Sequence, residues 1–333
     1  MANEVLNSLL KEYEQKKLKA ELDLEKRKLK LYEKLPKLQE IDDRLNQLSL
    51  LTAKNILLHN TSSLTDLTKK AEILKLEKAR ILKDANLPYD YLIPHYKCSI
   101  CKDTGYISNP TSQTQMCNCL KQRLLDASFY KSNMANLDQE NFDRFDESIF
   151  SNEIDVAKYR FNISPRENMK NIKQKCFDFV KNFDHSNTKN LLFSGNTGLG
   201  KTFMSNCIAS ELLKNGKTVL YQTAPVLLES IIDYKLSKNK NQLDNICESV
   251  LSVDLLIIDD LGTESLNSMK LSELFTILNT RILNLNHKMT KTIISTNLNI
   301  KDIFSHYEER IGSRIAGYYD IYYFFGEDLR FRK

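Results

Sequence analysis

The sequence predicts an α/β protein in which a helical segment precedes a parallel β-sheet in the C-terminal half of the 333-residue chain. Two patterns predict this fold class. Residues 1–87 contain no glycine and repeat apolar residues at helical spacing, whereas beyond Lys189 short apolar runs alternate with helical stretches. Such alternation is typical of βα units, which build a parallel sheet covered on both faces. The predicted strands are 191–194, 218–222, 254–258, 292–296 and 321–325.

Length and composition exclude several other classes of protein. Hydrophobic residues make up 41% and charged residues 27% of the chain, which is typical of folded rather than disordered sequences. The apolar runs are too short to cross a bilayer, and Glu4 and Lys11 flank the only apolar patch near the start, unlike a signal peptide. We therefore expect a cytoplasmic protein with no membrane partner. The net charge of +5 permits a polyanionic partner without requiring one.

The first 87 residues are expected to form two or three long amphipathic helices. Pro36 is expected to begin the second helix, because proline is tolerated in a first turn. Ser63 and Asp66 are expected to cap a third helix that runs to about Asp84. Dense Lys/Glu faces leave a narrow apolar seam, so the helices form either a small bundle or a docking arm that a partner protein covers. Residues 120–184 are also expected to be helical.

A glycine-rich loop follows the first predicted strand. Residues 195–202 match the pattern G-x-x-x-x-G-K-[ST] completely, and the flanking strand and helix disfavour a chance glycine turn. Glycines let backbone N–H groups surround a phosphate chain, and the next helix presents its positive end to that anion. Lys201 is expected to reach the β- and γ-phosphates of ATP, and Thr202 to bind Mg²⁺. The predicted nucleotide-binding residues are Gly195, Asn196, Thr197, Gly198, Leu199, Gly200, Lys201, Thr202 and Asp259.

Acidic and amide side chains follow two later strands. The strand around residues 254–258 ends in Asp259, expected to help bind Mg²⁺, and Asp260, expected to polarise the attacking water. Aspartate is shorter than the glutamate that many such ATPases use here, so we expect slow turnover. Glu264 is a second candidate base, and capping of a turn is the alternative for Asp260. Asn297, after the next strand, can orient the same water.

Four cysteines lie within 22 residues and form two close pairs. Cys98 with Cys101 and Cys117 with Cys119 can close a tetrahedral, structural Zn²⁺ site. A redox or iron–sulfur role and unliganded thiols are the alternatives. A segment this short buries little apolar area, so a metal ion would take the place of a core.

The order of these motifs resembles that of AAA+ ATPases. Residues 195–202 resemble the Walker A loop, residues 255–260 the Walker B strand, and Asn297 the sensor-1 position. Residues 309–314 resemble the Box VII segment, which carries an arginine finger. More narrowly, the stretches LLIIDDLGTE, STNL and ERIGSRI are similar to those of the DnaC/DnaI-type bacterial replicative helicase loaders and of IstB, a transposition ATPase.

The resemblance implies an AAA+ core with a five-stranded parallel sheet in the order 5-1-4-3-2. It also implies ATP bound between self-associating protomers, because an arginine finger acts on a neighbouring subunit. Arg314 is the first candidate for this finger and Arg310 the second, with a salt bridge to Glu308 or Glu309 as the alternative for either. Only 19 residues follow Arg314, so no C-terminal lid is expected, as in the loaders, and Arg330 could reach the nucleotide.

The function that the resemblance implies is ATP-dependent loading of a DnaB-type replicative helicase hexamer onto single-stranded DNA during DNA replication. Hydrolysis of ATP to ADP and phosphate would be slow and stimulated by the partner. An IstB-like transposition helper ATPase and an ATP-binding adaptor with little hydrolysis are the alternatives.

The resemblance also implies contact with single-stranded DNA near the region between the second and third strands. Lysines there could follow phosphates and tyrosines could stack on bases, or the segment could be a solvated loop. The candidates are Tyr221, Tyr234, Lys235, Lys238 and Lys240.

The chain is expected to divide into four parts. These are a helical partner-binding domain (1–90), a four-cysteine zinc module (91–125), a helical linker with the start of the ATPase domain (126–185), and the AAA+ ATPase core (186–333).

Overall fold

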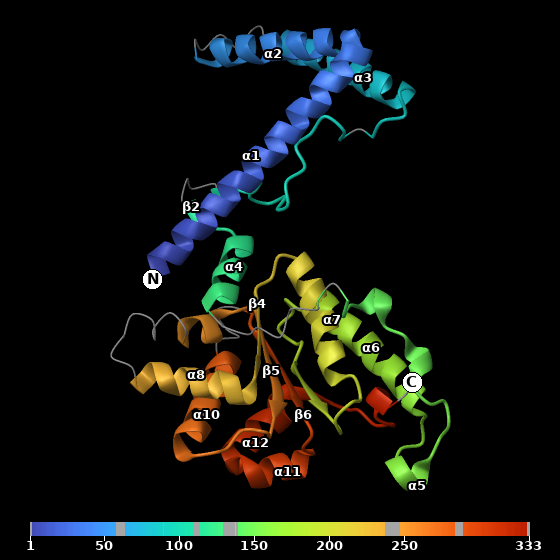
Figure 1. The fold of residues 1–333 in the computed structure, drawn as a ribbon, viewed down its shortest axis with the longest axis vertical. Helices are drawn as coiled ribbons and strands as arrows, with labels where there is room; N and C mark the ends of the chain where they lie inside the picture. Colours follow the sequence, from blue (N-terminus) through green and yellow to red (C-terminus); the bar gives the residue numbers. More distant parts are fainter. Residues whose placement is uncertain are drawn as a thin grey trace. The chain divides into compact units, whose positions relative to one another are not determined.

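The fold is described from a computed structural model, which places residues 2–57, 64–88, 90–108, 114–128, 137, 139–236, 247–283 and 289–331. Contacts divide the chain into two compact units, Asn7–Gln115 and Met116–Lys333, the second of which also includes Met1–Leu6 (Figure 1). Among the described residues, no helix has the length and apolar character needed to span a membrane.

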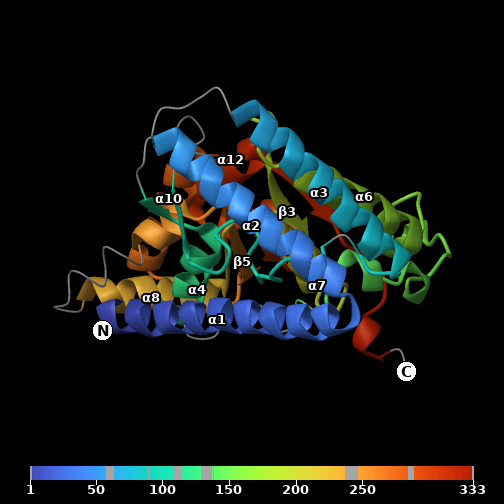
Figure 2. The same ribbon diagram turned by 90° about the horizontal axis from the view of Figure 1, so that it is seen from above.

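Three long helices make up most of the smaller unit. They are α1 (Ala2–Lys34), α2 (Pro36–Leu57) and α3 (Leu64–Asp84). The predicted start of the second helix at Pro36 and the predicted end of the third near Asp84 are confirmed, whereas Ser63 lies outside the described residues. Helices α2 and α3 lie side by side (Figures 1 and 2).

A small apolar core joins these helices where α1 meets α2. Leu31, Leu38 and Leu82, one from each helix, are buried there together with Leu92. Beside this core, Asp42 accepts hydrogen bonds from the Tyr32 hydroxyl at 2.6 Å and from the Lys78 ammonium at 2.5 Å. Because the core is confined to this end, apolar side chains farther along α2 and α3 stay exposed, among them Leu50, Leu57, Ile73 and Leu76.

A short hairpin and a helix follow. The hairpin pairs β1 (Tyr106–Ser108) with β2 (Thr114–Met116), and α4 (Asn118–Ser128) comes next. Gln122 on α4 bonds the backbone of Val219, donating to its carbonyl and accepting from its N–H, both at 2.8 Å. This amide takes the place of a neighbouring strand beside Val219, so α4 is anchored to the sheet within the larger unit.

A five-stranded parallel sheet forms the centre of the larger unit. Its strands are β3 (Asn190–Ser194), β4 (Val219–Thr223), β5 (Leu255–Leu261), β6 (Lys291–Thr296) and β7 (Tyr319–Tyr323). Their spatial order is β7-β3-β6-β5-β4, which is 5-1-4-3-2 when β3 is counted as the first strand. The observed order is therefore the one that the resemblance implies.

Two strands differ from their predicted limits by two residues or more. β7 begins at Tyr319, two residues before the predicted start, because it pairs with β3 from Asn190 onward. β5 continues past its acidic pair to Leu261, with an irregular register against β6 after Ile258. The acids therefore lie within a bulged strand, not beyond its end.

Helices cover both faces of the sheet. On one face α6 (Pro165–Lys181) and α7 (Lys201–Lys214) pack on alternate strand residues such as Leu255 and Ile257. On the other face α8 (Ala224–Leu236), α10 (Ser268–Leu283), α11 (Ile300–His306) and α12 (Glu308–Tyr318) pack on Leu256 and Ile258 (Figure 1). The near-continuous apolar runs of the sequence thus correspond to strands buried on both sides.

The stretch before α6 is less helical than expected. Its described residues contain only the 3₁₀ turns η1 (Phe142–Arg144) and η2 (Glu147–Ile149) and the four-residue α5 (Val156–Tyr159). Asn141, Asp146 and Asp155 accept backbone hydrogen bonds at the starts of these turns, so each turn is capped and short. A last 3₁₀ turn, η4 (Leu329–Phe331), follows β7.

Candidate nucleotide-binding site and metal centre

The glycine-rich loop joins β3 to α7 and has a backbone that requires glycine. Gly198 and Gly200 adopt left-handed conformations, with φ of +74° and +87°, and Gly195 has φ of +152°. A Cβ atom at Gly195 would lie 2.1 Å from the carbonyl oxygen of Phe324, and one at Gly198 would lie 1.8 Å from Asp328 Oδ1. The loop therefore packs closely against the segment after β7 and opens into α7 at Lys201, with the geometry of a helix N-terminal anion site.

Lys201 lies buried beneath this loop. Its Nζ donates hydrogen bonds to the carbonyl oxygens of Gly195 at 2.6 Å and Asn196 at 2.7 Å. Burial lowers the pKa of Lys201, and the nearby charges of Asp260 and Asp259 oppose this change. The ammonium group is thus held where phosphate oxygens bound by the loop could replace its carbonyl partners.

Asp259 is the most enclosed acid of the site, with an exposed fraction of 2%. Thr202 Oγ1 donates to its Oδ2 at 3.1 Å, and the Tyr221 hydroxyl donates to the same oxygen at 2.7 Å. Ser295 donates to the other oxygen, Oδ1. Hydroxyl and carboxylate oxygens are ligands that Mg²⁺ prefers, so the pair of Thr202 and Asp259 fits this ion.

Asp260, by contrast, is exposed and lies at the bulge of β5. Its φ of +55° places a non-glycine residue in the left-handed region, at a cost of about 1–2 kcal/mol. Partial desolvation raises the pKa of Asp260, Asp259 raises it further, and Lys201 and Arg330 act in the opposite direction. A strained acid near a buried lysine is an arrangement typical of catalytic sites.

A pocket of about 360 Å³ opens between the loop, the end of β6 and the segment after β7. Its lining residues are Asn196, Thr197, Leu199, Asn297, Gly326 and Asp328. The predicted Asn297 is thereby brought to the loop. Gly326 and Asp328 have no motif in the sequence and were not predicted. Leu329 N–H donates to the Gly198 carbonyl at 3.0 Å, and neighbouring Arg330 lies close enough to lower the pKa of Lys201 by its charge.

Glu264 has a different environment from that of the acidic pair. It is buried, one carboxylate oxygen accepts the Gly262 N–H at 3.0 Å, and the other accepts the Tyr307 hydroxyl. With both oxygens engaged, Glu264 connects the loop after β5 to the residue that precedes α12. These contacts favour Asp260 over Glu264 as the residue nearest the reaction.

Neither candidate arginine finger is among the described residues that line the pocket. Arg314, on α12, donates from Nε to Asn279 Oδ1 at 2.9 Å. Arg310 is exposed, pairs with Glu308 at 2.8 Å and lies over the ring of Phe275, 4.8 Å from its centroid. The salt-bridge alternative therefore describes Arg310 in the isolated chain.

Of the DNA-binding candidates, Tyr221 is assigned wrongly. It is completely buried against Asp259, so it cannot stack on a base. Lys235 pairs with Glu273 at 2.5 Å, and Lys238 and Lys240 lie outside the described residues.

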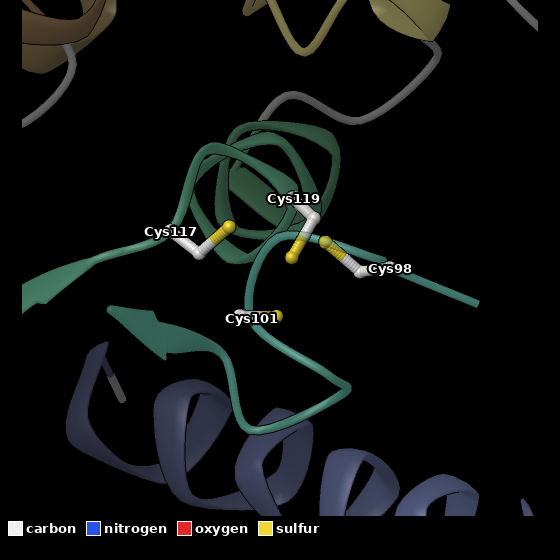
Figure 3. Close-up of side chains that lie close together, drawn as sticks. All are labelled: Cys98, Cys101, Cys117 and Cys119. Atoms are coloured by element: carbon white, nitrogen blue, oxygen red, sulfur yellow. The ribbon is translucent and has the colours of Figure 1, made fainter. Parts of the chain in front are cut away.

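The four cysteine sulfurs converge as the two predicted pairs require (Figure 3). The sulfur atoms of Cys98, Cys101, Cys117 and Cys119 all lie within 4.8 Å of one another. With a Zn–S bond of about 2.3 Å, sulfurs of a tetrahedral zinc site lie about 3.8 Å apart. The observed spacing is therefore close to that of a metal site, and four thiolates are a donor set that suits zinc.

The turn after Cys98 is built to hold the first cysteine pair. Asp103 is buried, and its backbone is in a left-handed conformation. Its carboxylate accepts hydrogen bonds from the N–H groups of Lys97 and Cys98, each at 2.8 Å. Gly105 N–H points at the Cys101 sulfur at 3.4 Å. Such outer hydrogen bonds orient thiolate ligands and stabilise their charge.

The sheet order, the glycine-rich loop and the acidic strand together define a nucleotide-binding protein of the AAA+ class. More narrowly, the chain belongs to the family of IstB-like ATP binding proteins, which its residues 113–311 match. The predicted family resemblance is thereby confirmed.

Individual relatives are similar over different lengths. The chain is 30% identical over 99 residues to the replicative helicase loader DnaC of Escherichia coli (strain K12), covering 30% of this chain and 40% of that protein. It is 23% identical over 240 residues to the replicative helicase loader DnaI of Bacillus subtilis (strain 168), covering 70% of this chain and 74% of that protein. A crystal structure of DnaI aligns with a TM-score of 0.41 and 22% identity, over 56% of this chain and 94% of that one. The match to DnaC thus spans less than half the length of that relative.

Proposed function

We propose that this chain is a cytoplasmic, ATP-dependent loader that places a DnaB-type replicative helicase hexamer onto single-stranded DNA during DNA replication. The observation that carries the proposal is its likeness, along most of the chain, to a protein named a replicative helicase loader. The nucleotide site supplies a means of driving a loading cycle, in which ATP binding favours assembly and hydrolysis favours release.

The proposed reaction is transfer of the γ-phosphoryl group of ATP to water. Lys201 would bind the β- and γ-phosphates, and Thr202 and Asp259 would hold Mg²⁺, which offsets charge on the phosphates when bound. Asp260 would polarise the attacking water and Asn297 would orient it. The raised pKa of Asp260 makes it a better proton acceptor than an ordinary aspartate, which supports its role as base.

An arginine acting between protomers would complete the site. Arg314 is the preferred finger, because within the described part of the chain its side chain hydrogen-bonds an uncharged amide, whereas Arg310 pairs with a carboxylate. Hydrolysis would then require self-association. Mixing Lys201→Ala protein with Arg314→Ala protein is expected to restore part of the phosphate release that each variant alone lacks. If the mixture is as inactive as its components, Arg314 does not act between subunits.

The helical unit would bind the helicase. A groove of about 350 Å³ lies between α2 and α3, lined by Arg44, Gln47, Leu48, Leu51, Lys70, Ile73 and Leu74. Its apolar floor and basic edges suit an amphipathic helix with acidic flanks. We propose the division into a partner-binding domain (1–90), a structural zinc module (91–125), a linker (126–185) and an AAA+ core (186–333).

The decisive experiment sizes a mixture of the chain and its host's replicative helicase, with and without ATP. A complex that forms with ATP, and places helicase on single-stranded DNA, supports the loader function. Leu51→Glu is expected to abolish the complex, because Leu51 lines the groove. Leu22→Glu on α1, away from that lining, is expected to leave the complex intact. It is a matched control, because the two leucines are equally exposed, at 50% and 51%. Failure of the wild-type chain to bind the helicase refutes the proposal.

A transposition helper is the second candidate, favoured by the IstB-like family description. Binding to a transposase in place of the helicase, in the same sizing experiment, would identify that function. The third candidate, an adaptor that binds ATP with little hydrolysis, predicts equal phosphate release by the wild type and by Lys201→Ala.

A further inference from the structure

Three hydroxyl groups converge on one carboxylate of the nucleotide site. Thr202 and Tyr221 both donate to Asp259 Oδ2, at 3.1 Å and 2.7 Å, and Ser295 donates to Oδ1. Only Thr202 belongs to the glycine-rich motif. The other two hydroxyls need a separate explanation, because neither lies on the loop that binds phosphate.

We infer that Tyr221, assisted by Ser295, is a positioning residue that aims the carboxylate of Asp259 at the Mg²⁺ of the bound nucleotide. The inference rests on the proposed function only in requiring that the chain bind ATP with this metal.

The sheet order explains how these residues reach Asp259. β5, which carries Asp259, lies between β4 and β6, so Tyr221 on β4 and Ser295 on β6 approach from opposite sides. In the register of β4 and β5, Thr223 is opposite Asp259, and Tyr221 lies two residues earlier on the same face. The long side chain of Tyr221 spans that offset and brings its hydroxyl to the carboxylate.

Burial makes these hydrogen bonds strong constraints. Asp259 is 2% exposed, and Tyr221 and Ser295 are fully buried, so solvent offers the carboxylate little alternative pairing. The phenolic O–H of Tyr221 is the donor in its hydrogen bond to Asp259. A charged acceptor in such surroundings keeps the orientation that its donors impose.

The two donors on Oδ2 have separate tasks. The Thr202 hydroxyl donates a hydrogen bond to Asp259, so the lone pairs of its oxygen remain free to bind the metal ion. Tyr221 lies on β4, outside the glycine-rich motif, and its hydrogen bond holds the carboxylate of Asp259 against rotation. A phenylalanine at position 221 would fill the core equally well, so the hydroxyl is the part of the side chain that this role requires.

Tyr221→Phe, which removes only that hydroxyl, tests the inference in the full chain. The readout is the affinity for a fluorescent ATP analogue, measured in EDTA and across a Mg²⁺ titration. The affinity in EDTA is expected to match the wild type, whereas the Mg²⁺ concentration for half-maximal binding rises about tenfold to 100-fold. Ser295→Ala is expected to shift it in the same direction.

Tyr319→Phe is the matched control. Tyr319 is also buried, but it lies at the start of β7 beside Asn190, at the opposite end of β3 from the glycine-rich loop. It is expected to leave the Mg²⁺ titration unchanged. The inference is overturned if Tyr221→Phe titrates like the wild type, if it weakens binding equally in EDTA, or if Mg²⁺ does not improve binding by the wild type.

If Tyr221→Phe does not fold, as judged by circular dichroism, Ser295→Ala decides the question by the same criteria. The helicase takes no part in this measurement. A chain that binds nucleotide with the expected Mg²⁺ dependence but loads no helicase would refute the proposed function and leave the role of Tyr221 standing.

Discussion

The close contact between the glycine-rich loop and the segment after β7 makes a sharp prediction for Gly195→Ala. The added Cβ would lie 2.1 Å from the Phe324 carbonyl oxygen, where ordinary contact begins at 3.4 Å. Phe324 cannot move away without cost, because it is buried and its N–H donates to the Ser194 carbonyl at 2.7 Å. The overlap therefore falls on backbone atoms that are fixed from both sides.

The expected loss of stability follows from two terms. Holding alanine at a φ of +152° costs about 1–3 kcal/mol. Relieving the overlap in a packed region costs about 1–3 kcal/mol more. The sum, about 2–6 kcal/mol, is a large share of the roughly 5–15 kcal/mol that stabilises a typical domain. Because the strain lies in the loop that is proposed to bind phosphate, we also expect ATP binding to be lost.

Urea unfolding followed by circular dichroism is the suitable assay, since the chain contains no tryptophan. Gly317→Ala is the matched control, because nothing lies within 4 Å of its added Cβ and its helix α12 favours alanine. The control is expected to be neutral or to gain up to about 1 kcal/mol. The reasoning is refuted if the free energy of unfolding of Gly195→Ala lies within about 0.5 kcal/mol of the wild-type value, which is roughly the scatter of neutral substitutions.

Three further predictions concern metal, pH and charge. Elemental analysis of the purified chain is expected to find one zinc ion. Cys117→Ser, which removes a buried sulfur, is expected to lose the zinc and to melt at a lower temperature. A variant that keeps its zinc would contradict the site of four cysteine ligands. Folding raises the pKa of Asp260, so its ionisation opposes folding at pH 7 and this cost disappears as pH falls through the folded pKa. Asp260→Asn is therefore expected to raise the melting temperature at pH 7 but slow hydrolysis, with a thermal gain that shrinks toward about pH 4; a gain independent of pH would contradict this origin. Asp328 lines the pocket beside the glycine-rich loop. Asp328→Asn is expected to strengthen ATP binding about twofold to tenfold, because it removes a negative charge that repels the phosphates. Glu327→Gln, outside that lining, is expected to have no effect in the same binding assay.

Local patterns were sufficient for much of this fold. The loop at residues 195–202 and the apolar runs of the strands are short-range features, and they predicted the sheet and the place of the glycine-rich loop between a strand and a helix. The limits of β5 were less predictable, because Asp259 and Asp260 interrupt the apolar run while the backbone pairing with β6 resumes at Leu261. Polarity marks a strand end in the sequence even where pairing continues.

The errors arose where distant residues decide the environment. Tyr221 resembles a base-stacking tyrosine in the sequence, but it lies in the core with residues of α6 and α7 and hydrogen-bonds Asp259, 38 residues away. Asp328 joins the site because it packs against Gly198, and no local sequence pattern predicts that contact. In the stretch before α6, Asn141 and Asp146 cap the starts of three-residue 3₁₀ turns, so this part of the predicted helical region 120–184 is not a continuous helix.

The hydrogen bond between Glu264 and Tyr307 links two regions that the proposed function brings into one cycle. Glu264 also holds Gly262, two residues after Asp260, and Tyr307 immediately precedes the helix that carries Arg314. In the proposed cycle, a displacement of the acidic strand on loss of the γ-phosphate would reach α12 through these two side-chain contacts. Nucleotide state and the orientation of Arg314 would then be coupled without refolding of the domain.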